Sequence, residues 1–509
     1  MRRTFAVILF LCLSCSIFAW KPWSLPMDSI DNKADTLFYG ASLSGIFGNA
    51  FWQYAGTLGD VTPLQYNGIA SLYAYKPSSR PNRWWDYSFG IQFNGRISGS
   101  AEKDKSIPTN NNGITATAYF QQLYAHCRLY IFDITAGIKP FSTTFGDETL
   151  SIGSLLFSKN AHFMPRVSIS IDKWTAFPFT YGYMEVRGGI SHLWAYPQPA
   201  TLYLPYQLPN NTQYSVVSGH YIHYKYAGVR LGGKLPVNIG YEFHHAAQWG
   251  GTSTKYGDLG NSMSAFRNVF LGKEGGNTAI ETNNVQGNHL CMQQLSLDIK
   301  LNALHISAYW QVLQDDGPIK FIGTTMNNAD GLWGVNISQN YVPYLQTLTY
   351  EFLNTTEQSG PVHDIDGFIF GGRDSYYSHS VYTHGWTYLG RTIGNPLLSP
   401  DNNRVRAHHI GIKGDIFTYR YRLLCTHARY YLQYAEDLPY NLSRTTAYKQ
   451  TSILLEVSKT VHQAWGLNFS AALGIDFFDN AKPDIGGRIS VSKTFLYDKK
   501  GRTQGTSRL

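Results

Sequence analysis

The 509-residue sequence predicts an all-β protein, a transmembrane antiparallel β-barrel of about 16–18 strands with small helical insertions. Three observations favour this fold class. The N-terminus carries an export signal, apolar and polar residues alternate along most of the chain, and Tyr and Trp gather at the ends of the alternating segments. Together they predict a protein of the outer membrane of a bacterium with two membranes.

The export signal occupies the first residues. Arg2 and Arg3 precede an apolar stretch from Phe5 to Phe18, which ends at the small residue Ala19. The stretch is shorter than the roughly 20 residues that a membrane-spanning helix requires. We therefore expect residues 1–19 to be a cleaved signal peptide. Lipidation at Cys15 is the alternative, but the residues before it match a lipoprotein processing site poorly.

Composition separates this chain from helical membrane proteins and from nucleic-acid-binding proteins. It has 36 Tyr, 12 Trp and 48 Gly, yet only 15% charged residues. After the signal peptide, no segment approaches 18 consecutive apolar residues, which excludes a helical bundle in the membrane. The net charge of +8 is scattered, so we expect no nucleic-acid partner. Cys127, Cys291 and Cys425 are too few and too widely spaced for a disulfide framework.

Alternation with a period of two residues is clearest from Tyr87 to Ile97, where apolar residues occupy one face of the predicted strand and polar residues the other. The same pattern recurs in segments listed here by range: 39–47, 119–138, 166–172, 183–194, 221–231, 295–301, 304–312, 407–431, 465–475 and 488–495. Outer-membrane barrels of bacteria use even strand counts, which favours sixteen or eighteen.

A secreted β-sandwich or solenoid would show the same alternation, so two further features decide between the folds. Aromatic residues stand at strand ends, as in Trp84-Trp85 and Trp194 with Tyr196, where the headgroup region of a membrane would hold them. The polar faces also contain Arg, Lys, Asp and His, which a wet lumen accommodates and a dry core does not. Both features favour the barrel.

The barrel is predicted to occupy residues 20–497, followed by a polar tail over residues 498–509. Long polar stretches at Gly99–Gly113 and Tyr196–Ser218 are typical of extracellular loops. Between Gly250 and Gly287, apolar residues recur with weak helical spacing, which predicts a short helix that lies outside the barrel or plugs it.

The sequence contains no G-x-S-x-G, P-loop, H-E-x-x-H or paired C-x-x-C motif. We therefore expect no catalytic residues and no cofactor, although a hydrolase that uses Ser and His stays an alternative. The pairs His244-His245 and His408-His409 suggest metal ligands at first sight. Adjacent residues of a strand point to opposite faces, however, so we expect no metal site there.

Aromatic, Arg, Asp, His and Asn residues are dense between Gly371 and His409. Rings that stack on the C–H faces of sugars, next to planar groups that bind hydroxyls in pairs, suit saccharide recognition. Arg would also favour a polyanionic saccharide. The alternative is that the rings belong to an interfacial girdle and the Arg residues to a polar network in the lumen. The predicted polysaccharide-binding residues are Arg373, Asp374, Tyr376, Tyr377, Trp386, Tyr388, Arg391, Arg404 and Arg406.

Several ordered blocks resemble the capsule-assembly (Wzi) family of outer-membrane proteins, in the form found in Bacteroidetes-type bacteria. The blocks that carry this resemblance are Gly153–Pro165, Gln248–Gly251, Gly287–Leu290, Asp330–Gly334, Tyr350–Phe352, Thr355–Pro361, Gly385–Tyr388, Gly390–Pro396 and Asn403–His409. The resemblance covers most of the mature chain.

The resemblance implies a barrel of about eighteen strands with a small periplasmic helical element. It implies a non-catalytic lectin that binds capsular or other surface polysaccharide and helps to assemble or attach it at the cell surface. The expected partners are that polysaccharide, outer-membrane lipid and, as a further candidate, the polysaccharide export machinery. A substrate-selective, porin-like channel is the alternative function, because barrels of this size often conduct solutes.

Overall fold

The structure is a computed structural model that describes residues 36–78, 83–100, 114–196, 217–278, 285–315, 330–358, 364–365, 368–369, 375–431, 448–461, 466–497 and 503–505. The predicted signal peptide, residues 1–19, lies outside the described residues. So do most of the two predicted extracellular loops and, apart from residues 503–505, the predicted tail.

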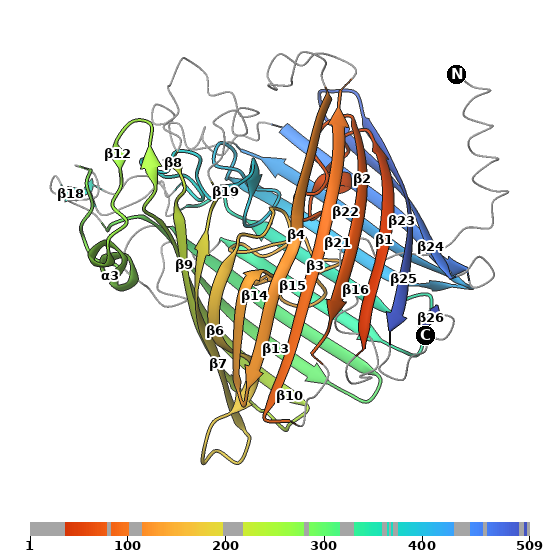
Figure 1. The fold of residues 1–509 in the computed structure, drawn as a ribbon, viewed down its shortest axis with the longest axis horizontal. Helices are drawn as coiled ribbons and strands as arrows, with labels where there is room; N and C mark the ends of the chain where they lie inside the picture. The colour runs from red at the N-terminus through yellow and green to blue at the C-terminus, as the bar shows by residue number, and fades with distance from the viewer. Residues whose placement is uncertain are drawn as a thin grey trace.

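Eighteen long antiparallel strands make up most of the described chain and close into a barrel (Figure 1). They are β1 (Leu37–Phe47), β2 (Tyr66–Lys76), β3 (Trp85–Gly99), β4 (Ile114–Leu129), β5 (Phe132–Ile138), β6 (Arg166–Ala176), β7 (Met184–Trp194), β9 (Tyr221–Leu231), β10 (Val237–Trp249), β13 (Asn288–Lys300), β14 (Leu304–Asp315), β15 (Gly331–Gln339), β16 (Thr347–Asn354), β21 (Val405–Ile416), β22 (Tyr419–Tyr430), β23 (Tyr448–Val461), β24 (Leu467–Phe478) and β25 (Asp484–Tyr497).

Each strand pairs with its neighbour along the chain, and β1 pairs with β25 to close the barrel. The closing register runs from Leu37 opposite Tyr497 to Phe47 opposite Gly487, so the seam has no free edge. A short strand, β26 (Thr503–Gly505), pairs with the end of β25. The predicted fold class is confirmed.

The apolar face of the alternating segments is the outer face of the barrel. In β3, for example, Phe89, Ile91 and Ile97 are exposed, whereas Ser88 and Asn94 point inward and are buried. A water-soluble β-sandwich buries its apolar faces, and this barrel exposes them around its circumference. Exposed apolar residues on a closed barrel match the hydrocarbon of a membrane.

The two ends of the barrel differ in their connections. At one end, which we call the short-turn end, the strands are joined by brief turns such as residues 130–131, 301–303 and 417–418. At the other, the long-loop end, the connections include residues 250–287 and 355–404. In outer-membrane barrels the short turns face the periplasm and the long loops face the exterior. We assign the long-loop end to the cell surface accordingly.

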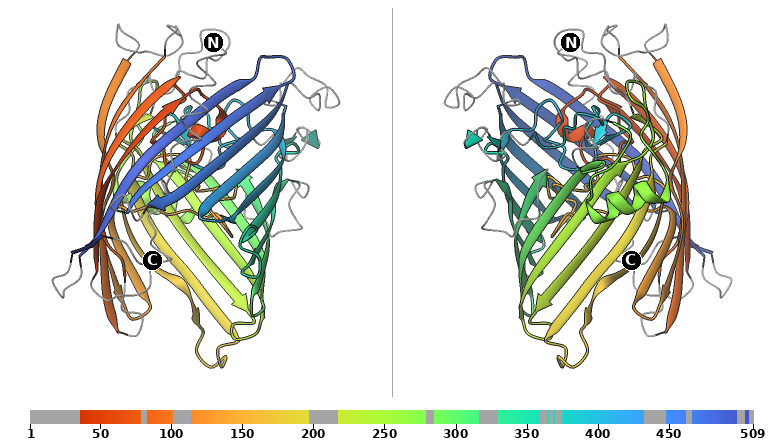
Figure 2. Two further views of the ribbon diagram at one scale, coloured as in Figure 1. Left: turned by 90° about the vertical axis from the view of Figure 1, so that its right-hand side faces the viewer. Right: turned by 90° about the vertical axis from the view of Figure 1, so that its left-hand side faces the viewer.

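Two short helices are present among the described residues. Helix α2 (Phe51–Tyr54) follows β1 and lies inside the lumen, where it contacts β23, β24 and β25. Helix α3 (Met263–Leu271) starts at an N-cap, Ser262, whose side chain accepts from the backbone N–H of Ala265. It packs on Ala247 and Trp249, which point outward from β10, and Figure 2 shows it on the outer side of the wall.

The helix expected near residues 250–287 is therefore outside the barrel rather than in its lumen. Neither helix lies at the short-turn end, so the described residues do not include the periplasmic helical element that the family resemblance implies. The remaining elements are small: β8 (Val217–Ser218), β11 (Thr252–Ser253), β12 (Gly257–Asp258), β17 (Asp364–Ile365), β18 (Phe368–Ile369), β19 (Thr387–Tyr388) and β20 (Arg391–Thr392).

Candidate functional site: a packed plug in the lumen

Three connections from the long-loop end fold into the lumen and pack together there. We call them the plug: residues 48–65, 139–165 and 375–404. Their buried apolar side chains form one cluster with inward-facing residues of the wall, from Leu193 on β7 to Ala472 on β24. Smaller clusters join Val61 to β1 and β2, and Leu58 to the end of β5. The plug therefore contacts the wall on all sides of the barrel.

The first plug segment is fixed by helix α2. The backbone N–H of Phe51 donates to the Asp476 carboxylate at 2.7 Å, and the indole N–H of Trp52 donates to Thr426 at 3.1 Å. A Cβ built at Gly474 would lie 3.1 Å from the Cβ of Ala50, so a side chain at this position of the wall would crowd the helix. Four residues are too few for a helix to be stable alone, so these wall contacts hold it.

Glu351, which points inward from β16, anchors the second segment. Its carboxylate accepts hydrogen bonds from the Ser151 hydroxyl and from the Ile152 N–H, both at 2.6 Å, and from the Tyr309 hydroxyl. The side chain is completely buried. Buried carboxylates are costly unless several donors surround them, and here three converge on one group. This contact ties two plug residues to two strands of the wall.

The third segment packs on the second. The Trp386 indole N–H donates to the Leu156 carbonyl at 2.8 Å, the Tyr377 hydroxyl donates to the Leu155 carbonyl, and the Asn395 amide donates to the Gly153 carbonyl at 2.6 Å. A Cβ at Gly394 would lie 2.3 Å from the Tyr377 hydroxyl oxygen, so this approach requires glycine. Two of these bonds, from Trp386 and Asn395, join three of the sequence blocks that carry the family resemblance.

Asp330, at the start of β15, links the third segment to the wall. It accepts from the backbone N–H groups of Glu357 and Gln358 at 3.0 and 2.8 Å and from the Tyr376 hydroxyl at 3.1 Å. Burial raises the pKa of the Asp330 carboxyl to about 7, against the effect of these donors. Through these three hydrogen bonds, the Asp330 side chain holds the start of the third plug segment, at Tyr376, and residues 357–358 next to the start of β15.

Five of the nine predicted polysaccharide-binding residues come together inside the plug. Tyr376, Tyr377, Trp386, Tyr388 and Arg404 are all at most 1% exposed. A ring without an exposed face offers no surface on which a pyranose can stack. The four rings pack against the plug and the wall, and Arg404 donates to the Thr356 carbonyl at 3.1 Å inside the lumen.

The other four predicted residues are separated. Arg391 lies at the edge of the plug, half-buried, where its guanidinium donates to the Val61 carbonyl at 2.7 Å and stacks over the Tyr54 ring at 4.6 Å. Arg406 points outward from β21 and is exposed. Arg373 and Asp374 lie outside the described residues. Among the predicted residues that the structure describes, Arg391 thus both belongs to the plug and is accessible to solvent.

On the short-turn side of the plug, the wall of the lumen carries charged side chains. Arg187 pairs with Glu242 and Arg230 pairs with Glu185, and the guanidinium carbons of both Arg residues lie 4.9 Å from the centre of the Trp174 ring. This inward ring lies within a bulge of β6, where the register with β7 shifts between Ile171 and Thr175. Sequence analysis did not single out this group, because its members come from four strands, β6, β7, β9 and β10, and meet only in the folded barrel.

The histidine pairs behave as the alternation predicts. His244 points inward and bonds to the Tyr224 hydroxyl at 2.9 Å, whereas His245 points outward and bonds to His289 at 2.8 Å. His409 contacts the Leu150 carbonyl in the plug at 2.6 Å, and His408 contacts Tyr350 on the outer face. Within the described ranges, no three His, Cys, Asp or Glu side chains are grouped to hold a metal ion.

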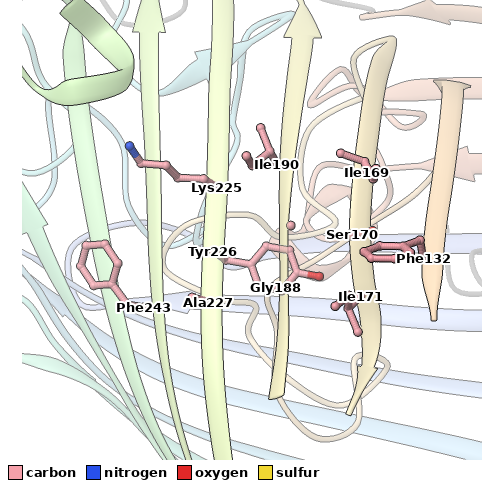
Figure 3. Close-up of a pocket in the computed structure, with 11 residues that line it drawn as sticks. Phe132, Ile169, Ser170, Ile171, Gly188, Ile190, Lys225, Tyr226, Ala227 and Phe243 are labelled. Atoms are coloured by element: carbon pink, nitrogen blue, oxygen red, sulfur yellow. The ribbon is translucent and has the colours of Figure 1, made fainter. Parts of the chain in front are cut away.

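A hollow on the outer wall is apolar and faces away from the plug (Figure 3). It lies where Gly188 and Ala227 leave space between larger side chains such as Ile169, Ile190 and Phe243. Lys225 extends from its edge toward α3, where it donates to the Phe270 carbonyl. The hollow offers hardly any hydrogen-bonding group for a hydroxylated ligand, so we do not assign it to saccharide binding.

Asp60, in the first plug segment, is a buried carboxyl with a raised pKa. It accepts from the Asn94 amide at 2.9 Å and the Tyr119 hydroxyl at 2.7 Å, and burial raises the pKa of its carboxyl to about 7. Because this pKa exceeds the ordinary value of 3.8, the folded plug holds the proton more tightly than the unfolded segment. Its stabilisation is complete below about pH 4 and is lost as the pH rises through about 7.

We therefore expect residues 57–61 to exchange their amide hydrogens more slowly at pH 5 than at pH 8, after correction for the intrinsic exchange rates. Asp60→Asn should remove most of this pH dependence. Hydrogen exchange followed by mass spectrometry measures both proteins. An equal pH dependence in Asp60→Asn would show that another group titrates.

The fold and the plug together define a class: the protein is an outer-membrane β-barrel whose lumen is filled by its own loops on the long-loop side. None of the helices in the described residues is long and apolar enough to span a membrane.

Comparisons with known proteins bear on the fold alone. No family model and no curated protein matches the sequence. Among solved structures, the chain is similar to Wzi of Escherichia coli, an outer-membrane protein involved in group 1 capsule assembly and described as a carbohydrate-binding β-barrel. The TM-score is 0.52 at 16% identity, over 90% of this chain and 84% of that one. This similarity supports the family resemblance at the level of the fold.

The chain is also similar to two further solved structures. OccAB2 of Acinetobacter baumannii has a TM-score of 0.44 at 10% identity, over 92% of this chain and 100% of that one. OccK2 (OpdF) of Pseudomonas aeruginosa, solved with glucuronate, has a TM-score of 0.44 at 10% identity, over 90% of this chain and 98% of that one.

Proposed function

We propose that this protein is a non-catalytic, lectin-like barrel that binds capsular or another surface polysaccharide at the long-loop end and helps to hold it on the cell. The observation that carries the proposal is the packed plug. A channel requires a continuous wet path, and the plug contacts the wall on all sides with fully buried side chains. A filled barrel suits a platform better than a pore. The Escherichia coli barrel of similar fold is described as carbohydrate-binding, which supports the proposal.

We further propose Arg391 as a saccharide contact at the surface of the plug. Its neighbour Val61 packs with Ile46 and Ile69, which are residues near the long-loop ends of β1 and β2. Arg391 and the partly exposed Tyr54 ring beneath it combine a planar donor with an aromatic ring. A guanidinium suits the carboxylates and hydroxyls of an acidic saccharide. Arg373 and Asp374 stay predicted contacts, and the export machinery stays a predicted partner.

Binding of the refolded protein to polysaccharide extracted from its own cells tests the proposal. We expect saturable binding, and deletion of the gene should loosen or strip the surface glycan. Wild-type protein that binds no extracted polysaccharide, together with a deletion strain whose glycan layer is intact, would overturn it.

Two single variants locate the contact. Arg391→Ala is expected to weaken binding about ten-fold, which corresponds to the loss of roughly one charged hydrogen bond. Trp174→Ala is the control, because its ring lies in the lumen below the plug, and we expect its binding to equal the wild type. If Trp174→Ala weakened binding and Arg391→Ala did not, the saccharide would lie in the periplasmic half of the lumen. That result would revive the channel alternative.

A further inference from the structure

Three basic residues stand side by side on the outer face of the barrel at the long-loop end. Arg406 of β21 is directly opposite Arg429 of β22, and Arg429 is directly opposite Lys449 of β23. Each is one residue from the long-loop end of its strand, and all three are exposed. Directly opposed residues on antiparallel strands have Cβ atoms about 5 Å apart. We call this set the basic row.

The basic row has no carboxylate partner among the described residues. Arg406 donates to the side chains of Asn354 and Thr356, at 3.3 and 3.5 Å, and both are uncharged. The Asp479 carboxylate accepts from the backbone N–H of Lys449 at 3.3 Å. None of the ion pairs formed within the described ranges includes a residue of the row. Like charges opposed across strands destabilise a sheet, so this arrangement favours an anion from outside the chain.

Below the row and one pair of histidines, the outer surface is apolar. Continuing down the same faces toward the short-turn end, the side chains are His408 and His427, then Ile410 and Cys425, and then residues such as Leu455. From Arg406 to Ile410 is four residues, which is about 13 Å along a strand and roughly 10 Å in height for a tilted one. The row therefore lies where lipid headgroups meet the hydrocarbon of the outer leaflet.

The rest of the rim contrasts with this row. Outward-facing residues at the long-loop ends of other strands are apolar or aromatic, as in Phe47, Tyr66, Ile114, Phe477 and Ile485. Such residues suit the interfacial aromatic girdle of a membrane barrel. The charge is thus concentrated on three consecutive strands instead of spread around the barrel.

We propose that the basic row binds the phosphate groups of an outer-leaflet glycolipid, whose acyl chains lie on the apolar surface of β21, β22 and β23. Arg pairs with phosphate through two parallel N–H groups, and Lys adds a point charge. The row faces the membrane side of the wall and not the plug, which favours a lipid over the polysaccharide of the proposed function. The inference needs only the outer-membrane location and does not depend on that function.

Native mass spectrometry of the folded protein released from detergent tests this proposal, with bis-phosphorylated lipid A as the probe. We expect the wild type to retain one lipid. Arg429→Gln/Lys449→Gln should lower the bound fraction about ten-fold, because each cation near an anionic lipid surface contributes appreciably to attraction. The matched control, Lys459→Gln/Lys493→Gln, removes two outward-facing charges at the short-turn end and should retain lipid as the wild type does.

Two measurements on the wild type need no variant. Lipid A without its phosphates should be retained far less than the bis-phosphorylated form, and raising the salt concentration should weaken retention through screening. Equal retention of both lipids, or equal retention by the two double variants, would overturn the proposal. Inorganic phosphate that displaces the lipid at comparable concentration would also overturn it, because the row would then be a general anion site.

Discussion

Replacing Glu351 with Ala is expected to release the second plug segment from the wall. The substitution leaves the Ser151 hydroxyl, the Ile152 N–H and the Tyr309 hydroxyl without their buried acceptor. Each unsatisfied buried donor costs about 1–3 kcal/mol, so local stability should fall by roughly 3–5 kcal/mol. Hydrogen exchange over residues 149–157 should accelerate by at least about a hundred-fold.

Glu351→Gln is the matched control, since the amide keeps one oxygen acceptor and nearly the same shape. It should lose clearly less protection than Glu351→Ala. If Glu351→Ala protein kept wild-type protection over this segment, the carboxylate would not be the anchor, and apolar packing alone would hold the plug.

Trp386→Ala should have a comparable effect on the third segment. The indole is fully buried, donates to the Leu156 carbonyl, and lies edge-on to the Phe157 ring with centroids 5.6 Å apart. Truncating a buried Trp to Ala typically costs about 3–5 kcal/mol through lost burial and the cavity that remains. We expect proteases to cleave residues 375–404 at least about a hundred-fold faster, whereas the strands stay resistant.

Trp386→Phe separates packing from hydrogen bonding, because it keeps much of the apolar volume and removes the indole N–H. An intermediate cleavage rate is expected. Wild-type protease resistance in Trp386→Ala would contradict the assignment of this ring to the plug core and would restore the sugar-stacking role that the sequence suggested.

The sequence predicts the barrel well because each strand carries its own signal. Tyr87–Ile97 alternates without interruption and lies within β3, and Tyr221–Leu231 coincides with β9. Alternation is local, so it survives without knowledge of distant contacts. It does not show which residues of different strands meet, which explains why Trp174 and its two Arg neighbours were not predicted.

The plug could not be predicted in the same way. Its segments have no period, and their partners lie far along the chain: Ser151 bonds to Glu351, and Trp386 to Leu156. Because the sequence does not show those partners, the aromatic residues between Gly371 and His409 suggested a surface that binds a ligand. The one segment with helical spacing, near residues 250–287, instead packs on the outer wall through Ala265 and Val269.

The predicted site illustrates this limit. Tyr376, Tyr377, Trp386 and Tyr388 belong to one buried cluster, and composition does not show whether such residues face a ligand or one another. Exposure depends on the complete set of neighbours, which a pattern of residue types does not contain. Arg391 is directly opposite Tyr388 across the turn at Leu389-Gly390, yet Tyr388 is fully buried and Arg391 is half-buried.

Ionic conductance of the purified wild-type barrel in planar lipid bilayers tests the central claim, that the lumen is closed and the barrel is a platform for polysaccharide. A variant that lacks residues 375–400 serves as the open reference. We predict no stepwise conductance from the wild type and clear steps from the deletion variant. Regular conductance steps from the wild type that added saccharide blocks would contradict the account and identify the protein as a channel.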